Sequence, residues 1–262
     1  MCRFLAYRGD PVFLADLVYA PAHSLVRQSL HAAEAEIGAH GDGFGVGWYG
    51  ERAEPGLYRD PRPAWSDENL KSLCEQVRSR AFFAHVRAST GAPTARANCH
   101  PFVHGRWLFM HNGQIGGYAR LKRRIEALIP DALYDARQGS TDSEAIFLIA
   151  LALGLGRNPV GAVAHALEAV RAQMAAAAVA EPLRFTAALT DGRSLYAFRY
   201  ACDGRPPSLY YRETGGGLIV ASEPIDGLKT GWRQAPKGCA LVARASRPLA
   251  VEPLGASLSS AA

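Results

Sequence analysis

The chain has 262 residues, of which 48% are hydrophobic and 20% are charged, and its formal net charge is +5. This composition argues against wholesale disorder and suits one large globular domain, or two small ones that share a core. The longest apolar run, residues 145–155, is too short to span a bilayer, and residues 1–7 are too short for the apolar part of a signal peptide. The basic residues are scattered, and we interpret their densest cluster as the solvated face of one helix: Arg120, Lys122, Arg123 and Arg124. We therefore expect a cytoplasmic protein that binds neither membranes nor nucleic acid.

The first half of the chain alternates predicted strands and helices. Short apolar runs, one of them alternating with glycine, predict strands over residues 3–7, 43–48, 81–87 and 106–110. Ser66 precedes two acidic residues and then apolar residues at helical spacing, which predicts a helix that reaches Val77. An amphipathic pattern predicts a second helix over residues 118–129.

The second half begins with two helices and continues as strands. Thr141 and Glu144 form a capping box ahead of a helix over residues 145–155, and an alanine-rich helix is predicted over residues 159–180. Strands are predicted over residues 184–190, 194–200, 208–212, 217–221 and 239–244. Many antiparallel strands with a few long helices predict a layered α+β fold rather than a doubly wound sheet. No linker divides the chain, so we assign residues 1–254 to one domain and residues 255–262 to a frayed tail.

One of the five cysteines lies next to the initiator methionine. None forms a C-x-x-C pair, so we expect reduced thiols, with Cys74, Cys202 and Cys239 in the core. Because a small second residue usually leads to removal of the initiator methionine, Cys2 would carry both a thiol and a free α-amine. The reference pKa of an α-amine, about 7.7–8, allows it to act as a general base at neutral pH. Taken alone, Cys2 is more often a buried thiol on a first strand.

Three further segments carry groups that the cleavage of an α-amino acid amide requires. Where a strand stops at His111-Asn112-Gly113, it presents a side-chain amide and an exposed N–H, which are the donors of an oxyanion hole. Arg87, followed by Ser89 and Thr90, could grip a carboxylate, and Asp142 could hold an ammonium group. Taken alone, each segment also has a simpler explanation. His111-Asn112-Gly113 could be a turn, Arg87 could form a surface ion pair, and Asp142 could be a favourable charge at the start of a helix. Their joint occurrence is much more specific than any one of them.

At these positions the sequence resembles the class II glutamine amidotransferases, which are N-terminal nucleophile hydrolases. The family's motifs occur in the family's order over roughly the first 145 residues, as Met1-Cys2, His85-Val86-Arg87, Asn98-Cys99-His100-Pro101, His111-Asn112-Gly113 and Thr141-Asp142-Ser143-Glu144. The resemblance implies that Cys2 is the nucleophile and that Asn112 and Gly113 form the oxyanion hole. It also implies a four-layer αββα sandwich with antiparallel sheets, and neither a cofactor nor a metal.

The same resemblance implies how the substrate is bound. Arg87 would bind the substrate α-carboxylate with help from Thr90, Asp142 would bind the α-ammonium, and His100 would lie near the substrate. Larger family members often have a tryptophan after the motif arginine and a histidine four positions after it. This chain has Ala88 and Gly91 there, which implies a more open pocket wall.

A narrower resemblance is to the compact branch of this family, and it rests on segments such as Pro21-Ala22-His23-Ser24-Leu25 and Gly41-Asp42-Gly43-Phe44-Gly45. That branch includes the amidotransferase subunit of the fungal alternative glutathione-degrading complex and the γ-glutamyl hydrolase of ergothioneine biosynthesis. The implied activity is hydrolysis of a γ-glutamyl amide, in glutamine, glutathione or a related compound, through a γ-glutamyl thioester on Cys2.

Four other interpretations explain parts of the pattern. A non-catalytic γ-glutamyl-binding subunit, or an enzyme that works only with a peptidase-like or synthase partner, would contain the same motifs. A metal hydrolase would need His100 and His104 to meet, but Pro101 disfavours a helix between them, and in a strand they lie ~13 Å apart. A catalytic pair of Cys99 and His100 is disfavoured because neighbours on a strand point to opposite faces.

Overall fold

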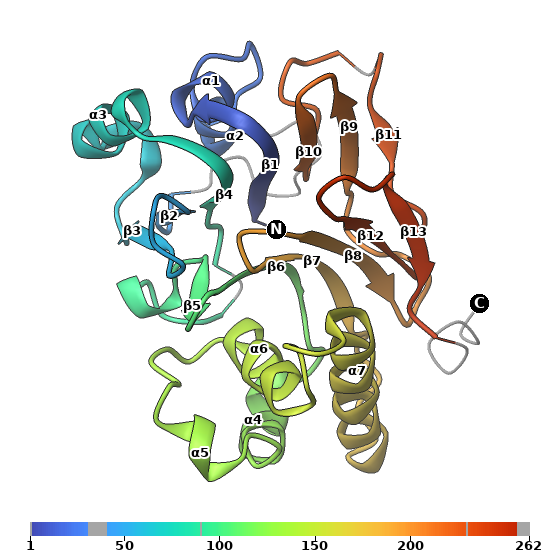
Figure 1. The fold of residues 1–262 in the computed structure, drawn as a ribbon. Helices are drawn as coiled ribbons and strands as arrows, with labels where there is room; N and C mark the ends of the chain where they lie inside the picture. The colour runs from blue at the N-terminus through green and yellow to red at the C-terminus, as the bar shows by residue number, and fades with distance from the viewer. Residues whose placement is uncertain (1, 31–40, 90, 229, 256–262) are drawn as a thin grey trace.

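In the computed structural model, which describes residues 2–30, 41–89, 91–228 and 230–255, two antiparallel sheets lie face to face (Figure 1). The first has seven described strands in the order β11 (Arg233–Gln234), β9 (Tyr210–Thr214), β10 (Gly217–Ala221), β1 (Arg3–Phe13), β4 (Arg78–Val86), β2 (Phe44–Trp48) and β3 (Gly56–Asp60). The second has six described strands in the order β13 (Ala250–Pro253), β12 (Cys239–Ala243), β8 (Leu195–Ala201), β7 (Arg184–Thr190), β6 (Trp107–Gln114) and β5 (Phe102–His104).

Helices cover the outer face of each sheet (Figure 1). The first sheet packs against α1 (Ala15–Val18), α2 (Leu25–Leu30) and α3 (Glu68–Gln76). The second packs against α4 (Tyr118–Glu126), α6 (Asp142–Ala152) and α7 (Pro159–Ala176), with the short α5 (Asp131–Tyr134) beside them. The order of layers is therefore helix, sheet, sheet, helix, which confirms the predicted α+β class and four-layer arrangement.

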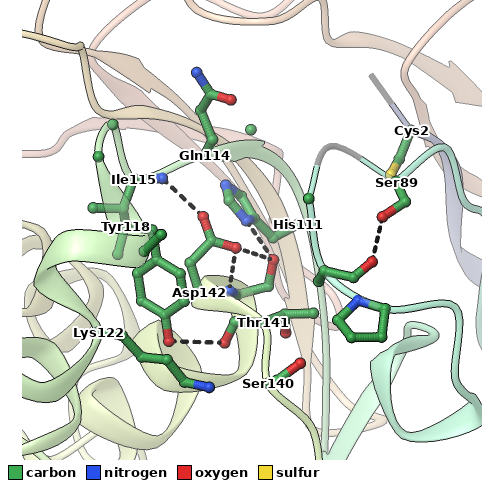
Figure 2. A pocket seen from close by; sticks show the side chains of 18 of the residues that line it. Cys2, Ser89, His111, Gln114, Ile115, Tyr118, Lys122, Ser140, Thr141 and Asp142 are labelled. Atoms are coloured by element: carbon green, nitrogen blue, oxygen red, sulfur yellow. Dashed lines mark hydrogen bonds between the residues drawn. The ribbon is translucent and has the colours of Figure 1, made fainter.

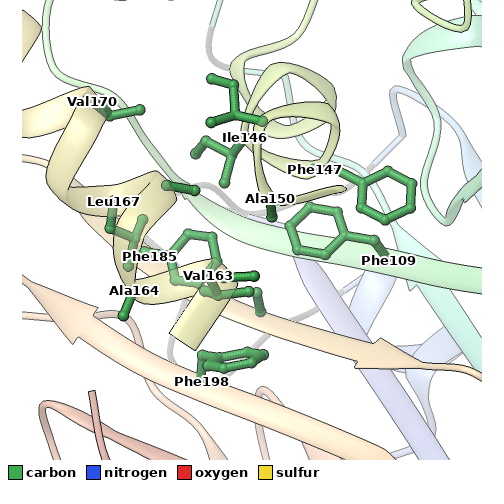
Figure 3. Close-up of a cluster of buried hydrophobic side chains, with 14 of the residues drawn as sticks. Phe109, Ile146, Phe147, Ala150, Val163, Ala164, Leu167, Val170, Phe185 and Phe198 are labelled. Atoms are coloured by element: carbon green, nitrogen blue, oxygen red, sulfur yellow. The ribbon is translucent and has the colours of Figure 1, made fainter. Parts of the chain in front are cut away.

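Three hydrophobic cores hold the four layers together. The largest joins the second sheet to its helices (Figure 3), where the rings of Phe109 and Phe147 stack with centroids 5.1 Å apart. A separate core lies between the two sheets and contains Phe4, Phe83 and Met110. Because side chains alternate along a strand, every strand that borders this middle core presents one face to it and the other to the helices.

The predicted strands are confirmed, although the ends of several elements differ from those predicted. The strand expected to stop at residue 110 continues to Gln114, because Asn112 and Gly113 stay paired with Thr186 and Phe185 of β7. The first strand runs on to Phe13 through an irregularity in its pairing with β4 after Arg8. Helix α3 is capped by Asp67, whose carboxylate accepts the Leu70 N–H at 2.7 Å, rather than by Ser66.

The cysteines predicted to lie in the core differ in their burial. Cys74 is fully buried, as predicted, but Cys202 and Cys239 are only half-buried because they lie at the ends of strands. Residues 256–262 of the predicted tail lie outside the described residues. Within the described residues, no helix is both long and apolar enough to cross a membrane.

Candidate active site

The alternation of the strands brings Cys2 and Asn112 to the same end of the middle core. Cys2 directly precedes β1, whose Phe4 and Ala6 lie in that core, so a position two residues earlier faces the same layer. Leu108 and Met110 of β6 lie in the same core from the second sheet, and Asn112 continues their face. The thiol-bearing residue and the amide-bearing residue therefore approach one space from opposite sheets.

A cleft of about 660 Å³ opens at this end of the molecule (Figure 2). Most of the predicted site residues line it: Cys2, Arg87, His100, Gly113 and Asp142. Asn112, which precedes Gly113 on β6, is buried and is not among the lining residues. Thr90, predicted to assist Arg87, lies outside the described residues. The cleft is large enough for a substrate of metabolite size.

The two predicted oxyanion donors sit in the paired part of β6 rather than in a turn after it. Asn112 is 1% exposed, and its side-chain Nδ2 has no hydrogen-bond partner within the part of the chain that the structure describes. Gly113 has φ +151°, and a Cβ at this position would run into the carbonyl of Arg184 and the ring of His111. A buried amide without a hydrogen-bond partner is uncommon in folded proteins. An oxygen atom of a bound ligand could be the missing partner.

The Cys2 thiol is half-buried and donates to the Ala88 carbonyl with an S···O distance of 3.4 Å. Burial raises the pKa of this thiol, and the positive charges of Arg87 and Arg3 act in the opposite direction. Since burial is the larger effect, the resting thiol is protonated at neutral pH. A nucleophile at this position needs a base that removes its proton.

Arg87 follows the end of β4 directly and is 4% exposed, so it is not the surface residue that a lone arginine usually is. Its Nη1 donates to the Asp42 carbonyl at 3.3 Å, and its Nη2 donates to Ser89 Oγ and to the Ala92 carbonyl at 3.0 Å. These neutral acceptors fix the guanidinium at the cleft without neutralising its charge. Such a cation can bind a carboxylate.

Asp142 is held at the start of α6 by backbone groups. Its Oδ2 accepts the Ile115 N–H and its Oδ1 accepts the Ser143 N–H, both at 2.8 Å (Figure 2). The predicted capping box is formed only in part: Thr141 Oγ1 accepts the Glu144 N–H at 3.3 Å, whereas the Glu144 carboxylate accepts backbone N–H groups of residues 138 and 139 instead. Asp142 therefore presents an oriented, half-buried carboxylate to the cleft.

Two histidines, His100 and His111, line the cleft, and the ring of His85 lies beside that of His100. His111 Nε2 faces the Arg184 carbonyl at 3.3 Å and must be the protonated nitrogen, so its Nδ1 accepts from the Ser143 hydroxyl at 2.8 Å. Burial lowers the pKa of His111, and it lowers that of His100 well below the ordinary value. The His100 ring lies 4.3 Å from that of His85, centroid to centroid.

Neither histidine-based alternative matches this geometry. Among the described residues, no group of three or more His, Cys, Asp or Glu side chains is arranged to hold a metal ion. Cys99 lies after a short 3₁₀ turn (Arg96–Asn98) rather than on a strand, which corrects the premise used for the Cys99–His100 pair. Its thiol faces the carbonyls of Asp60 and Ala95 at 3.5 Å, and burial raises the thiol pKa to about 11.

Comparison with known proteins agrees with this geometry. The family model "Glutamine amidotransferases class-II" matches residues 15–211. The chain is 33% identical to the probable glutamine amidotransferase DUG3 of Saccharomyces cerevisiae, over 90% of this chain and 80% of that protein. It is 29% identical to the gamma-glutamyl-hercynylcysteine sulfoxide hydrolase of Mycolicibacterium smegmatis, over 90% of this chain and 92% of that protein.

Solved structures extend the comparison to the fold. A glutamine aminotransferase class-II domain protein from Silicibacter pomeroyi superposes with a TM-score of 0.76 at 38% identity, covering 97% of this chain and all of that chain. The glutamine phosphoribosylpyrophosphate amidotransferase of B. subtilis, at 14% identity and a TM-score of 0.64, shares the fold over 98% of this chain and 50% of its own. The chain is therefore an enzyme of the class II glutamine amidotransferase family.

Proposed function

We propose that this enzyme hydrolyses γ-glutamyl amides with the thiol of Cys2 as the nucleophile and the α-amine of the same residue as the base, once Met1 is removed. The observation that supports the proposal is that Cys2 and Gly113 line one cleft at the end of the middle core, and that Asn112, next to Gly113 on β6, has a buried side-chain Nδ2 without a described partner. A thiol and an amide donor in such positions match what attack on an amide carbonyl needs.

The reaction follows from these positions in two halves. The α-amine, directly or through a water, takes the thiol proton, and the thiolate attacks the γ-carbonyl carbon. Asn112 Nδ2 and the Gly113 N–H hold the oxyanion while the amine protonates the leaving nitrogen, so that the C–N bond breaks and a γ-glutamyl thioester remains. Water then attacks the thioester, and glutamate and the free thiol are released.

Arg87 and Asp142 make the site selective for the glutamyl half of the substrate. The α-carboxylate pairs with the guanidinium of Arg87, and the α-ammonium pairs with the carboxylate of Asp142. Both side chains are already oriented by backbone groups, so little ordering is lost when the substrate binds. His100 borders the same cleft and contributes to its wall. Glutamine, glutathione and related compounds all share this glutamyl half.

The test is the intact mass of the protein before and after treatment with the glutamine analogue 6-diazo-5-oxo-norleucine, followed by peptide mapping. We expect loss of Met1 and one adduct, located on Cys2. Cys2→Ala should abolish the adduct and the activity, whereas Cys239→Ala, which removes another half-buried thiol, should preserve both. A retained Met1, or an adduct on another cysteine, would contradict the proposal.

The same preparation separates a self-sufficient hydrolase from the partner-dependent enzyme that the compact branch suggests. A Cys2 adduct together with turnover of γ-glutamyl amides by the purified chain supports the first. A Cys2 adduct without turnover until a peptidase-like or synthase protein is added supports the second.

A further inference from the structure

The residue after the nucleophile carries the first charge of a buried ion pair. The side chain of Arg3 is 1% exposed, although arginine is rarely buried so completely. Its Nε donates to Glu223 Oε1 at 2.6 Å, and its Nη1 folds back and donates to the carbonyl oxygen of Cys2 at 3.0 Å. Neither Arg3 nor Glu223 lines the cleft. The mechanism above makes no use of either group.

Glu223 is itself tied to a third residue and to the first strand. Its side chain is 1% exposed, and its Oε2 lies 2.9 Å from Nε2 of His23, in the Pro21–Leu25 segment that the mechanism leaves unexplained. The neighbouring Ser222 exchanges two hydrogen bonds of 3.0 Å with the backbone of Phe4. The segment after β10 is therefore hydrogen-bonded to two consecutive residues at the start of β1, Arg3 and Phe4.

An N-terminal nucleophile needs contacts that hold its backbone in place. Once Met1 is removed, residue 2 is attached to the protein on one side only, and no preceding peptide restrains its rotation. Two of the contacts that hold it are the hydrogen bond from its thiol to the Ala88 carbonyl and the hydrogen bond from Arg3 to its own carbonyl. Of these two, the thiol bond is lost when the thiolate forms, whereas the Arg3 bond persists through attack.

We propose that Arg3 and Glu223 are positioning residues, which hold the backbone of Cys2 so that its thiol and amine face the substrate carbonyl. The ion pair orients the guanidinium, and the guanidinium fixes the Cys2 carbonyl. The charge of Arg3 also acts on the thiol: burial is the main influence on the pKa of Cys2 and raises it, and Arg3 opposes that rise. The catalytic part of this inference rests on the proposed function.

The test uses the mature full-length protein and the variant Arg3→Lys. Lysine keeps the buried positive charge beside Glu223, but it lacks the planar fork that reaches the Cys2 carbonyl at the same time. We expect kcat to fall about 10²-fold, with KM for the γ-glutamyl donor nearly unchanged, because misplacement of a reacting group by ~1 Å has that effect. Glu223→Gln should act in the same direction. Asp226→Asn is the matched control, since it removes a carboxylate from a half-buried ion pair of the same segment that does not touch β1.

Alkylation by iodoacetamide, mapped cysteine by cysteine, gives a readout that does not depend on turnover. In Arg3→Lys the limiting rate at Cys2 should rise several-fold, because the released residue is no longer half-buried, while the rate at the core residue Cys74 stays unchanged. Equal increases at Cys2 and Cys74 would show general loosening, and no change at Cys2 with wild-type kcat would also overturn the proposal. If the wild type hydrolyses no γ-glutamyl amide even when a peptidase-like or synthase partner is added, the proposed function fails, and the alkylation rates still decide whether Arg3 positions Cys2.

Discussion

Replacement of Asn112 by leucine should change activity and stability in different directions. The Nδ2 of Asn112 is buried, and no described residue accepts its hydrogen bonds. A buried donor without a partner destabilises a fold by about 1–3 kcal/mol, and an apolar side chain of similar shape removes that penalty. In the transition state, however, loss of one oxyanion donor costs on the order of 10²–10³ in kcat, or about 2.7–4 kcal/mol. We therefore expect Asn112→Leu to be as stable as the wild type or more stable, and to be nearly inactive.

The assays are urea unfolding and steady-state hydrolysis of a γ-glutamyl amide. The matched control is Thr186→Val, at the position directly opposite Asn112 in the β6–β7 ladder. The Thr186 hydroxyl is also buried, but it donates to the Pro207 carbonyl at 3.1 Å, so its loss should destabilise the fold by about 0.5–1.5 kcal/mol and leave kcat unchanged. An Asn112→Leu protein with near wild-type kcat, or one that unfolds like a cavity mutant, would refute the reasoning.

Three further changes address binding, acid stability and the core. Asp142→Asn should raise KM for the donor by about 10- to 100-fold and lower kcat less, because a charge-assisted hydrogen bond of about 1.5–3 kcal/mol to the ammonium is lost; initial-rate kinetics measure the split. Hydrogen bonding from Arg62 lowers the pKa of Asp60 to about 2, whereas its value in the unfolded chain is near 4. The Asp60 carboxylate therefore stabilises the fold fully above pH ~4, and this stabilisation is lost as the pH falls through about 2. Asp60→Asn should therefore reduce the free energy of unfolding by about 1–2 kcal/mol at pH 7, discounted for the exposed arginine, and by nearly nothing at pH 2. Phe147→Ala should lower it by about 3–5 kcal/mol in urea titrations, since it empties a fully buried site stacked on Phe109.

The sequence was most informative where local pattern and local structure coincide. Alternation with glycine predicted β2, and the strands predicted over residues 184–190 and 194–200 are β7 and β8. The short strands β3, β5 and β13 were not predicted, because three to five residues of mixed burial carry too little periodicity. Their places are decided by neighbouring strands rather than by their own residues.

The site shows the same division. Residues such as Cys2, Arg87 and Asp142 could be proposed from their chemistry and order, and the fold places them around one cleft. The groups that orient these residues could not be predicted. Asp142, for example, is held by the backbone N–H of Ile115, a donor that every residue except proline offers. The Arg3–Glu223 contact joins residues 220 positions apart, and neither residue belongs to a motif.

Three titratable groups that line the cleft are poorly suited to act as the base. His111 is committed on both nitrogens, and burial holds the pKa of His100 so low that it binds a proton poorly at neutral pH. The carboxylate of Asp142 is engaged by two backbone N–H groups. The α-amine of Cys2 is then the group whose pKa suits the task.

If the α-amine is the base, the thiol alone is not sufficient for catalysis. Protein produced while methionine aminopeptidase is inhibited should retain Met1, and with it the thiol, both oxyanion donors and the glutamyl-binding charges, but the nitrogen of Cys2 would then be an amide that cannot accept a proton. We expect such protein to lose at least 10²-fold in kcat, the usual contribution of a general base, while iodoacetamide still alkylates Cys2. Removal of Met1 by added aminopeptidase should restore the rate. Full activity with Met1 in place, measured on a sample whose intact mass shows a single species, would mean that another group takes the thiol proton.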